Sequence, residues 1–233
     1  MLLLAEETSL LLTDPVTGRP LTSGERVGLA AAGAVLVELV LSGHVDIAGP
    51  GHPLVAPGRV AVRPVPATGD PVLDEALHRL ALDARPRRPQ EVLPRLAKGL
   101  RDALHDRLAA SGILRAEPVR ALGITWTTRW PAVDPAGPSA ALRLRLREVV
   151  VGSRAPDARD ATLVAVVHAV GRVPDVVGDL GLSRGEVRRR AAAVADGQVG
   201  GEAVRRAIAA AEAVTAAVAA ATAASVVATT SSS

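Results

Sequence analysis

The segment from residue 24 to residue 41 constrains the fold more than any other part of the chain. Its sequence, GERVGLAAAGAVLVELVL, places apolar residues on nearly every side of a helix rather than along one stripe. Ser23 precedes it as a candidate N-cap, and Ser42-Gly43 follow as a stop signal. Because such a helix has little polar surface to offer to water, we expect it to lie buried at the centre of the fold.

The composition favours the same arrangement. The chain has 233 residues, 48% of them hydrophobic, with two Trp and no Phe or Tyr. Its core must therefore be filled by Ala, Val and Leu, whose small side chains let helices approach closely. The absence of cysteine excludes disulfides, thiolate nucleophiles and Cys-ligated metals. Heavy use of Ala, Arg, Gly and Pro suggests a GC-rich bacterial gene.

Cap and turn signals divide the rest of the chain into short elements without βαβ repetition. The predicted fold class is mainly α, a single globular multi-helix domain with short strands at residues 1–215. Residues 216–233 form an Ala/Thr/Ser-rich tail that we expect to be mobile. A break is expected at Gly200-Gly201. The other predicted helices cover residues 72–82, 91–110, 140–151, 157–170, 173–180 and 184–196, and the predicted strands cover residues 44–47 and 59–65.

The chain shows no membrane-spanning or secretory signal. The N-terminal MLLLAEETSLLL lacks a basic region and contains Glu6 and Glu7, so it is not a signal peptide. The most apolar long run, residues 208–227, contains Glu212 and is mostly Ala and Thr, which is too weakly hydrophobic to span a bilayer. We therefore expect a cytoplasmic protein that is not integral to a membrane. A net charge of only +3 argues against a dedicated nucleic-acid binder.

The stretch from residue 91 to residue 131 is the candidate working surface. It predicts one long amphipathic helix followed by a β-hairpin that carries Trp126 and Trp130, the only aromatic side chains of the Phe, Trp and Tyr types. A basic helix face beside indoles is what a protein presents to an anionic lipid surface. The alternative is a core helix with solvated charges and two buried tryptophans. The basic side chains of the helix fall on one arc: Lys98, Arg101 and His105, with Arg95 just beyond.

Catalytic motifs are missing from the sequence. It contains no phosphate-binding glycine loop, no GxSxG motif and no metal-ligand spacing among its five histidines, so no catalytic residue, metal or cofactor is predicted. The turn that ends at Asp70 is interpreted as a helix cap rather than a ligand loop. Residues 182–190, LSRGEVRRR, resemble the recognition helix of a helix-turn-helix protein. Arg and Ala are poor readers of base edges, so a solvated helix is the favoured interpretation.

Several segments together resemble one protein family, the Golgi phosphoprotein 3 family. They occur in the family's order across residues 1 to about 215, and the third is the most specific. The chain is identified on this resemblance as a bacterial, more narrowly actinobacterial, member. The matching segments are LLLAEETSLLLTDPVTGR, GAVLVELVLSGHVDI, PATGDPVLDEAL, LAKGLRDALHDRLAASGIL, TTRWP and ATLVAVVHA.

The resemblance implies a mainly α-helical fold with a projecting β-hairpin. It also implies peripheral membrane binding through phosphatidylinositol 4-phosphate, as in the eukaryotic members, and no catalysis. The hairpin that enters the membrane corresponds to residues 115–130, with Trp126, Trp130 and Arg129 as its membrane residues.

The family's lipid pocket uses a tryptophan, an arginine on the central helix and two basic residues on the long helix. The basic pair falls on Lys98 and Arg101, whereas a shifted register would place it on Gln90 and Leu93. The tryptophan position falls near Ser23 and the arginine position on Ala32, so both groups are lost. Arg26, early on the central helix, is the candidate replacement.

The predicted function is therefore a non-enzymatic peripheral membrane protein that binds an anionic lipid. Lys98, Arg101 and Arg26 are the candidate phosphate contacts. Because two pocket groups are lost, and bacteria generally lack that phosphoinositide, a different anionic lipid or phosphorylated ligand is an open alternative. Two other functions stay open: a winged-helix-like nucleic-acid binder using residues 184–190, and an interaction scaffold whose hairpin docks onto a partner or a second protomer.

Overall fold

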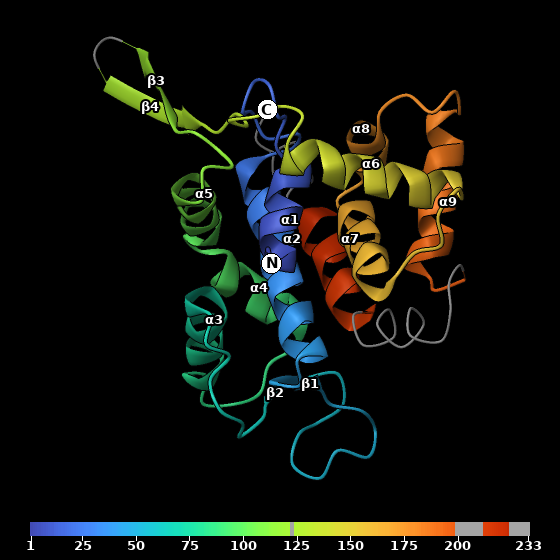
Figure 1. The fold of residues 1–233 in the computed structure, drawn as a ribbon. Helices are drawn as coiled ribbons and strands as arrows, with labels where there is room; N and C mark the ends of the chain where they lie inside the picture. Colours follow the sequence, from blue (N-terminus) through green and yellow to red (C-terminus); the bar gives the residue numbers. More distant parts are fainter. Residues whose placement is uncertain (122–123, 199–211, 224–233) are drawn as a thin grey trace, which may run out of the picture.

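The computed structural model describes residues 1–121, 124–198 and 212–223 and confirms the mainly α fold class (Figure 1). Helices pack around one core, and the strands of the described residues form two small antiparallel pairs. The elements in chain order are α1 (Leu4–Leu11), α2 (Gly24–Leu41), β1 (Val45–Ile47), β2 (Val60–Val62), α3 (Pro71–Ala81), α4 (Pro89–Ala97), α5 (Leu100–Ala110), β3 (Glu117–Ala121), β4 (Ile124–Arg129), α6 (Pro138–Val151), α7 (Ala158–Ala169), α8 (Val173–Val177) and α9 (Arg184–Ala195), and residues 212–223 form a further helix.

Helix α2 is the central buried helix that its apolar sequence predicts. Its middle residues have almost no solvent exposure, and α1, α4, α5 and α7 pack around it. The Ser23 hydroxyl accepts a hydrogen bond from the Arg26 backbone amide at 3.3 Å, as expected of an N-cap. Small residues let its neighbours come close: a Cβ atom on Gly33 would overlap Val218 of the helix at residues 212–223.

The long helix expected over residues 91–110 is wrong, because the chain breaks between α4 and α5. Lys98 is extended, with ψ at 113°, and Gly99 takes a left-handed conformation with φ at +74°. A left-handed glycine is a common way to end a helix, because its missing Cβ removes the steric penalty. A single glycine is also tolerated inside a helix, so the apolar period continues past it in the sequence without marking the break.

Arginine side chains tie the sequence segments that carry the family resemblance. Arg107 of α5 pairs with Glu6 of α1 at 2.9 Å and with Asp70 at 2.7 Å. Asp70 also caps α3, because its carboxylate accepts from the backbone amide of Val72 at 2.9 Å. The predicted cap is therefore confirmed, and the same carboxylate links α3 to α5, while Arg107 extends the link to α1 through Glu6. Arg159 of α7 pairs with Glu7 in the same way, at 2.7 Å.

The β3–β4 hairpin projects from the helical body (Figure 1). Its strands are antiparallel, with an irregularity between Val119 and Arg120, and residues 122–123 between them lie outside the described residues. The root is held by backbone bonds: the Trp130 amide donates to the Gly18 carbonyl at 3.1 Å. A Cβ on Gly18, whose φ is +63°, would overlap the Trp130 and Pro131 backbone, so this close approach requires glycine.

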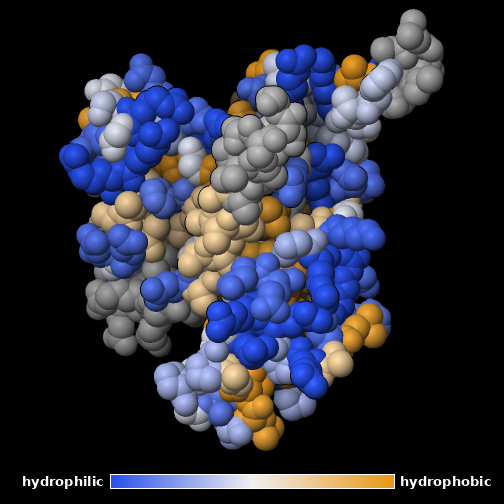
Figure 2. Space-filling model, turned by 180° about the vertical axis from the view of Figure 1, so that it is seen from behind, coloured by the Kyte–Doolittle hydropathy of each residue, from blue (hydrophilic) through white to orange (hydrophobic). Residues whose placement is uncertain are grey.

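The helix at residues 212–223 packs its Val214 and Val218 side chains into the core with no exposure. The domain boundary expected at residue 215 falls inside this helix, and residues 224–233 and the expected Gly200-Gly201 break lie outside the described residues. Figure 2 shows mostly hydrophilic side chains on the back of the molecule, with a paler strip where this Ala-rich helix is exposed. Within the described ranges, no helix combines the length and the apolar character needed to cross a bilayer.

Candidate functional site

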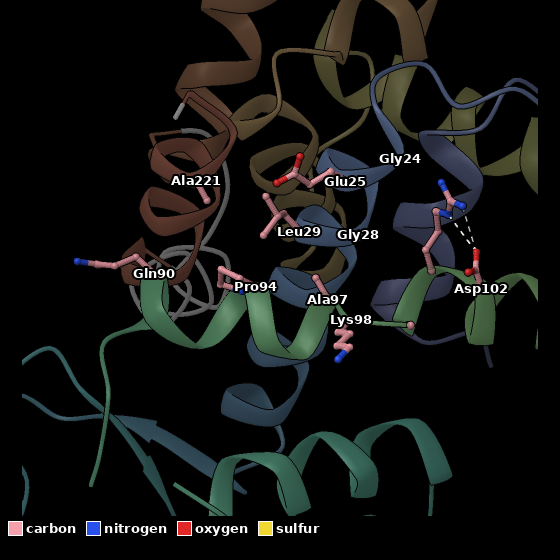
Figure 3. Close-up of a pocket in the computed structure, with 12 residues that line it drawn as sticks. Gly24, Glu25, Gly28, Leu29, Gln90, Pro94, Ala97, Lys98, Asp102 and Ala221 are labelled. Atoms are coloured by element: carbon pink, nitrogen blue, oxygen red, sulfur yellow. Dashed lines mark hydrogen bonds and ion pairs between the residues drawn. The ribbon is translucent and has the colours of Figure 1, made fainter. Parts of the chain in front are cut away.

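A cavity of about 640 Å³ opens where α4 approaches the first turns of α2 and meets the start of α5 (Figure 3). We call it the α4–α5 pocket. Its floor is built from small residues on α2 and α4, and the Ala97 side chain lies in van der Waals range of Gly28. Charged side chains surround this floor. The lining residues are Gly24, Glu25, Gly28, Leu29, Gln90, Pro94, Ala97, Lys98, Gly99, Arg101, Asp102 and Ala221.

The break between α4 and α5 brings Lys98 and Arg101 to this pocket. Lys98 is exposed, and its carbonyl accepts a hydrogen bond from Arg79 Nη1 at 2.9 Å, whereas its ammonium has no hydrogen bond or ion pair with a described residue. The Arg101 guanidinium lies over Gly24 at the start of α2 and bonds the Asp102 carboxylate through Nε at 3.2 Å and Nη2 at 3.1 Å. In Figure 3 the Lys98 ammonium points away from Asp102, the ion-pair partner of Arg101. Both predicted residues therefore line one pocket, but their charged ends are apart.

The two sequence registers for the basic pair place different residues at this pocket. In the first register, Lys98 and Arg101 both line the pocket. In the shifted register, Gln90 lines it but Leu93 has no exposure and belongs to the core. Of the two lost positions, Ser23 immediately precedes the lining residue Gly24, whereas Ala32 is fully buried.

Arg26 is not brought together with this pair. Its Nη2 donates to the Thr222 carbonyl at 2.7 Å, which fastens the start of α2 to the end of the helix at residues 212–223. Arg26 is absent from the lining of the α4–α5 pocket, although its neighbour Glu25 belongs to it. Successive residues of a helix point about 100° apart, which separates these two side chains.

His105 does not belong to the exposed basic face that the helical period indicates. Its side chain is 4% exposed, and its ring lies 5.2 Å from the Trp130 ring, centroid to centroid. Burial first, and the charge of Arg101 second, lower the pKa of His105 to about 4. The imidazole is therefore neutral at neutral pH and adds no positive charge. Because the helix begins again at Leu100, its buried arc includes both Leu104 and His105.

The two tryptophans lie in different surroundings. Trp126 on β4 is 72% exposed, whereas Trp130 is half-buried at the hairpin root and packs against the core. Arg129, the last residue of β4, is half-buried. Of these three predicted membrane residues, Trp126 therefore presents the largest apolar surface to solvent.

Most of the arginines of the basic helix α9 form ion pairs. Arg189 and Arg190 both pair with Glu186, and Arg184 pairs with Asp175 at 2.8 Å. The Arg190–Glu186 and Arg184–Asp175 pairs are 2.7 and 2.8 Å long. Fewer guanidinium donors of α9 are therefore available for nucleic-acid phosphates. Among the described residues, no group of three His, Cys, Asp or Glu side chains is arranged to hold a metal ion.

Together these features define a class, a mainly helical domain with a projecting hairpin and a pocket of mixed charge at a helix break. The sequence model of the Golgi phosphoprotein 3 family matches residues 4–211, and the chain belongs to this family. The predicted membership is thus confirmed, whereas the bacterial origin stays a prediction. No curated protein matches the chain in a sequence search.

Proposed function

We propose that this protein is a non-enzymatic peripheral membrane protein, acting on the cytoplasmic side, that binds an anionic lipid. The α4–α5 pocket receives the head-group phosphate, and the β3–β4 hairpin contacts the membrane surface. The observation that carries the proposal is that Lys98 and Arg101 both line one cavity of about 640 Å³. This volume lies in the range typical of small-molecule sites.

The start of α5 supplies a second attraction for phosphate. Its N-cap is Gly99, which has no side chain to bond the first amides of the helix. These amides carry partial positive charge, and phosphate groups commonly bind at such helix ends. Lys98 and Arg101 flank this end. A phosphate here would accept charge-assisted hydrogen bonds, each worth about 1.5–3 kcal/mol.

The existing partner of Arg101 does not block this role. The Asp102 side chain is 67% exposed, and the Arg101 side chain is 35% exposed. Ion pairs in such solvated positions contribute about 0–1 kcal/mol. A phosphate with bidentate contacts to the guanidinium would therefore displace the carboxylate at little cost. Lys98 has a long, flexible side chain, so its ammonium can turn toward the same anion.

The hairpin supplies the membrane contact in this proposal. Trp126 is 72% exposed, and an indole is favoured at the boundary between head groups and acyl chains. Arg120 on β3 is exposed, and basic residues near an anionic surface contribute about 1 kcal/mol each. By family resemblance the head group is similar to phosphatidylinositol 4-phosphate. The losses at Ser23 and Ala32 are the reason to test other phosphate-bearing head groups beside it.

Flotation with vesicles tests the proposal. Wild-type protein is mixed with phosphatidylcholine vesicles that contain, or lack, an anionic lipid, in parallel arms with phosphatidylinositol 4-phosphate and phosphatidylglycerol. The Lys98→Glu, Arg101→Glu double variant should lose at least about tenfold in affinity for the anionic vesicles. The matched control is Arg85→Glu with Arg88→Glu, which makes the same change in net charge at exposed positions outside the pocket. Equal losses in both double variants would show that only overall charge matters.

The exposed Trp126 also suits the scaffold alternative, in which the hairpin docks onto a second copy of the chain. One variant distinguishes the membrane function from the scaffold function. Trp126→Ala should lower vesicle recovery and leave the molar mass in light scattering unchanged if the hairpin serves the membrane. A change in molar mass with unchanged vesicle binding would favour the scaffold.

A further inference from the structure

The α4–α5 pocket carries opposite charges in equal number. Lys98 and Arg101 contribute two positive charges, and Glu25 and Asp102 contribute two negative charges. Asp102 is already bonded to Arg101 at 3.1 Å. Glu25 is exposed, and within the described part of the chain it has no hydrogen bond or ion pair through its carboxylate. The described lining thus sums to zero formal charge.

The charges are also separated within the pocket. In Figure 3 the Glu25 side chain points away from Asp102, the ion-pair partner of Arg101. Glu25 extends into the space between α2 and the helix that carries Ala221, whereas the Arg101 guanidinium lies against Gly24 at the start of α2. The Arg101–Asp102 pair sums to zero charge, so Lys98 and Glu25 are the charged lining residues without an ion-pair partner among the described residues. A head group that carries an ammonium beside its phosphate complements both kinds of charge.

We propose that the pocket selects an aminophospholipid head group, in which a phosphodiester is joined through a two-carbon linker to a primary ammonium. The phosphate lies between Lys98, Arg101 and the first amides of α5. The ammonium donates hydrogen bonds to the Glu25 carboxylate. This inference rests on the proposed function, because it assigns the head group that the same pocket receives.

Hydrogen bonding distinguishes this head group from phosphatidylcholine. A primary ammonium has three N–H donors, whereas the quaternary ammonium of choline has none. Glu25 can therefore accept a charge-assisted hydrogen bond from the former but not from the latter. Lys98 and Arg101 would then contact the phosphate of any phospholipid, and Glu25 would add the choice of an ammonium-bearing head group.

The test holds surface charge constant. Two sets of vesicles contain the same fraction of phosphatidylglycerol, and the remainder is phosphatidylcholine alone or a mixture in which phosphatidylethanolamine replaces part of it. Wild-type protein should bind the vesicles with phosphatidylethanolamine about tenfold more tightly, as expected for one additional charge-assisted hydrogen bond. Glu25→Gln should abolish this difference and strengthen binding to the vesicles without phosphatidylethanolamine, because the repelling charge is gone.

A matched control and a soluble probe complete the experiment. Asp106→Asn removes one negative charge from an exposed position of α5 outside the pocket and should retain the wild-type preference. Phosphoethanolamine should compete with vesicles better than phosphocholine does, which excludes effects of lipid packing. Circular dichroism checks that each variant is folded.

Different results would overturn the assignment of the ammonium and the proposed function. A preference for phosphatidylethanolamine that persists in Glu25→Gln, or one that wild-type protein lacks, overturns the assignment of the ammonium. If the Lys98→Glu, Arg101→Glu variant binds phosphatidylglycerol vesicles as wild type does, the proposed function itself fails.

Discussion

Acid should destabilise the fold through one buried side chain, His105. Its ring is 4% exposed against Trp130, and neither ring nitrogen has a hydrogen-bond partner among the described residues. Burial and the neighbouring Arg101 charge lower its pKa from 6.5 to about 4, and Asp102 opposes this only in part. A proton on this ring would place a buried charge at the hairpin root.

The direction of this pH effect follows from the pKa of His105, which is 6.5 in the unfolded chain and about 4 in the folded chain. Above pH 6.5 the ring is neutral in the folded and unfolded chains, so it contributes no pH dependence. Between pH 6.5 and about 4 the unfolded chain binds the proton and the folded chain does not, so the free energy of unfolding falls as the pH falls. With about 1.4 kcal/mol for each unit, the loss reaches about 2–3 kcal/mol near pH 4.5.

Urea denaturation across this pH range, on wild type and His105→Phe, measures the effect. Phenylalanine keeps a ring against Trp130 and removes the titrating nitrogens. Burial raises the pKa values of Glu7, Glu38 and Asp160, but these groups are present in both proteins, so their contributions cancel in the difference. The variant should lose less stability in acid than wild type. Parallel curves for the two proteins would refute the reasoning.

Two further predictions concern the α4–α5 break and the ion pairs of α1. Gly99→Ala places a side chain on a residue with left-handed backbone and should lower the free energy of unfolding by about 1–2 kcal/mol. Gly99→Asn should lower it less. Thermal denaturation of both variants measures the difference. Arg107→Met leaves the 2%-exposed Glu6 without its cation and should cost about 3–5 kcal/mol in chemical denaturation. A loss below about 1 kcal/mol would mean that solvent reaches this carboxylate.

The sequence predicts those parts of the fold whose signals are local. The N-caps at Ser23, Asp70 and Ser183 each lie within three residues of the amide that they bond, so a short stretch contains both partners. The buried character of α2 is likewise evident in its own eighteen residues. Element type and approximate bounds therefore follow from periodicity and capping.

The missed features depend on contacts between distant segments or on two competing local outcomes. Nothing near Arg107 indicates that it joins Glu6 to Asp70, because those partners lie on other elements. Gly99 is compatible with a continuous helix or with a break, and tertiary packing decides between them.

Some residues of the candidate site have a signal in the sequence, and one does not. Lys98 and Arg101 follow from the basic pattern and the family resemblance. Glu25 opposite them has no signal in the sequence, because a glutamate in the first turn of a helix is ordinarily explained by the helix dipole. Only the fold places it in the same pocket.

The unequal surroundings of the two tryptophans give the protein two intrinsic optical reporters. The chain has no tyrosine, so its near-ultraviolet emission comes from Trp126 and Trp130 alone. Trp126 is 72% exposed, so its emission should shift to shorter wavelength on transfer from water to a lipid interface. Trp130 lies 5.2 Å from His105, whose ring is protonated in the folded chain only near pH 4, so its emission should respond to that protonation in acid. The emission wavelength of an unlabelled sample therefore reports the insertion of Trp126 into a membrane. Its emission intensity in acid reports the protonation of His105 beside Trp130.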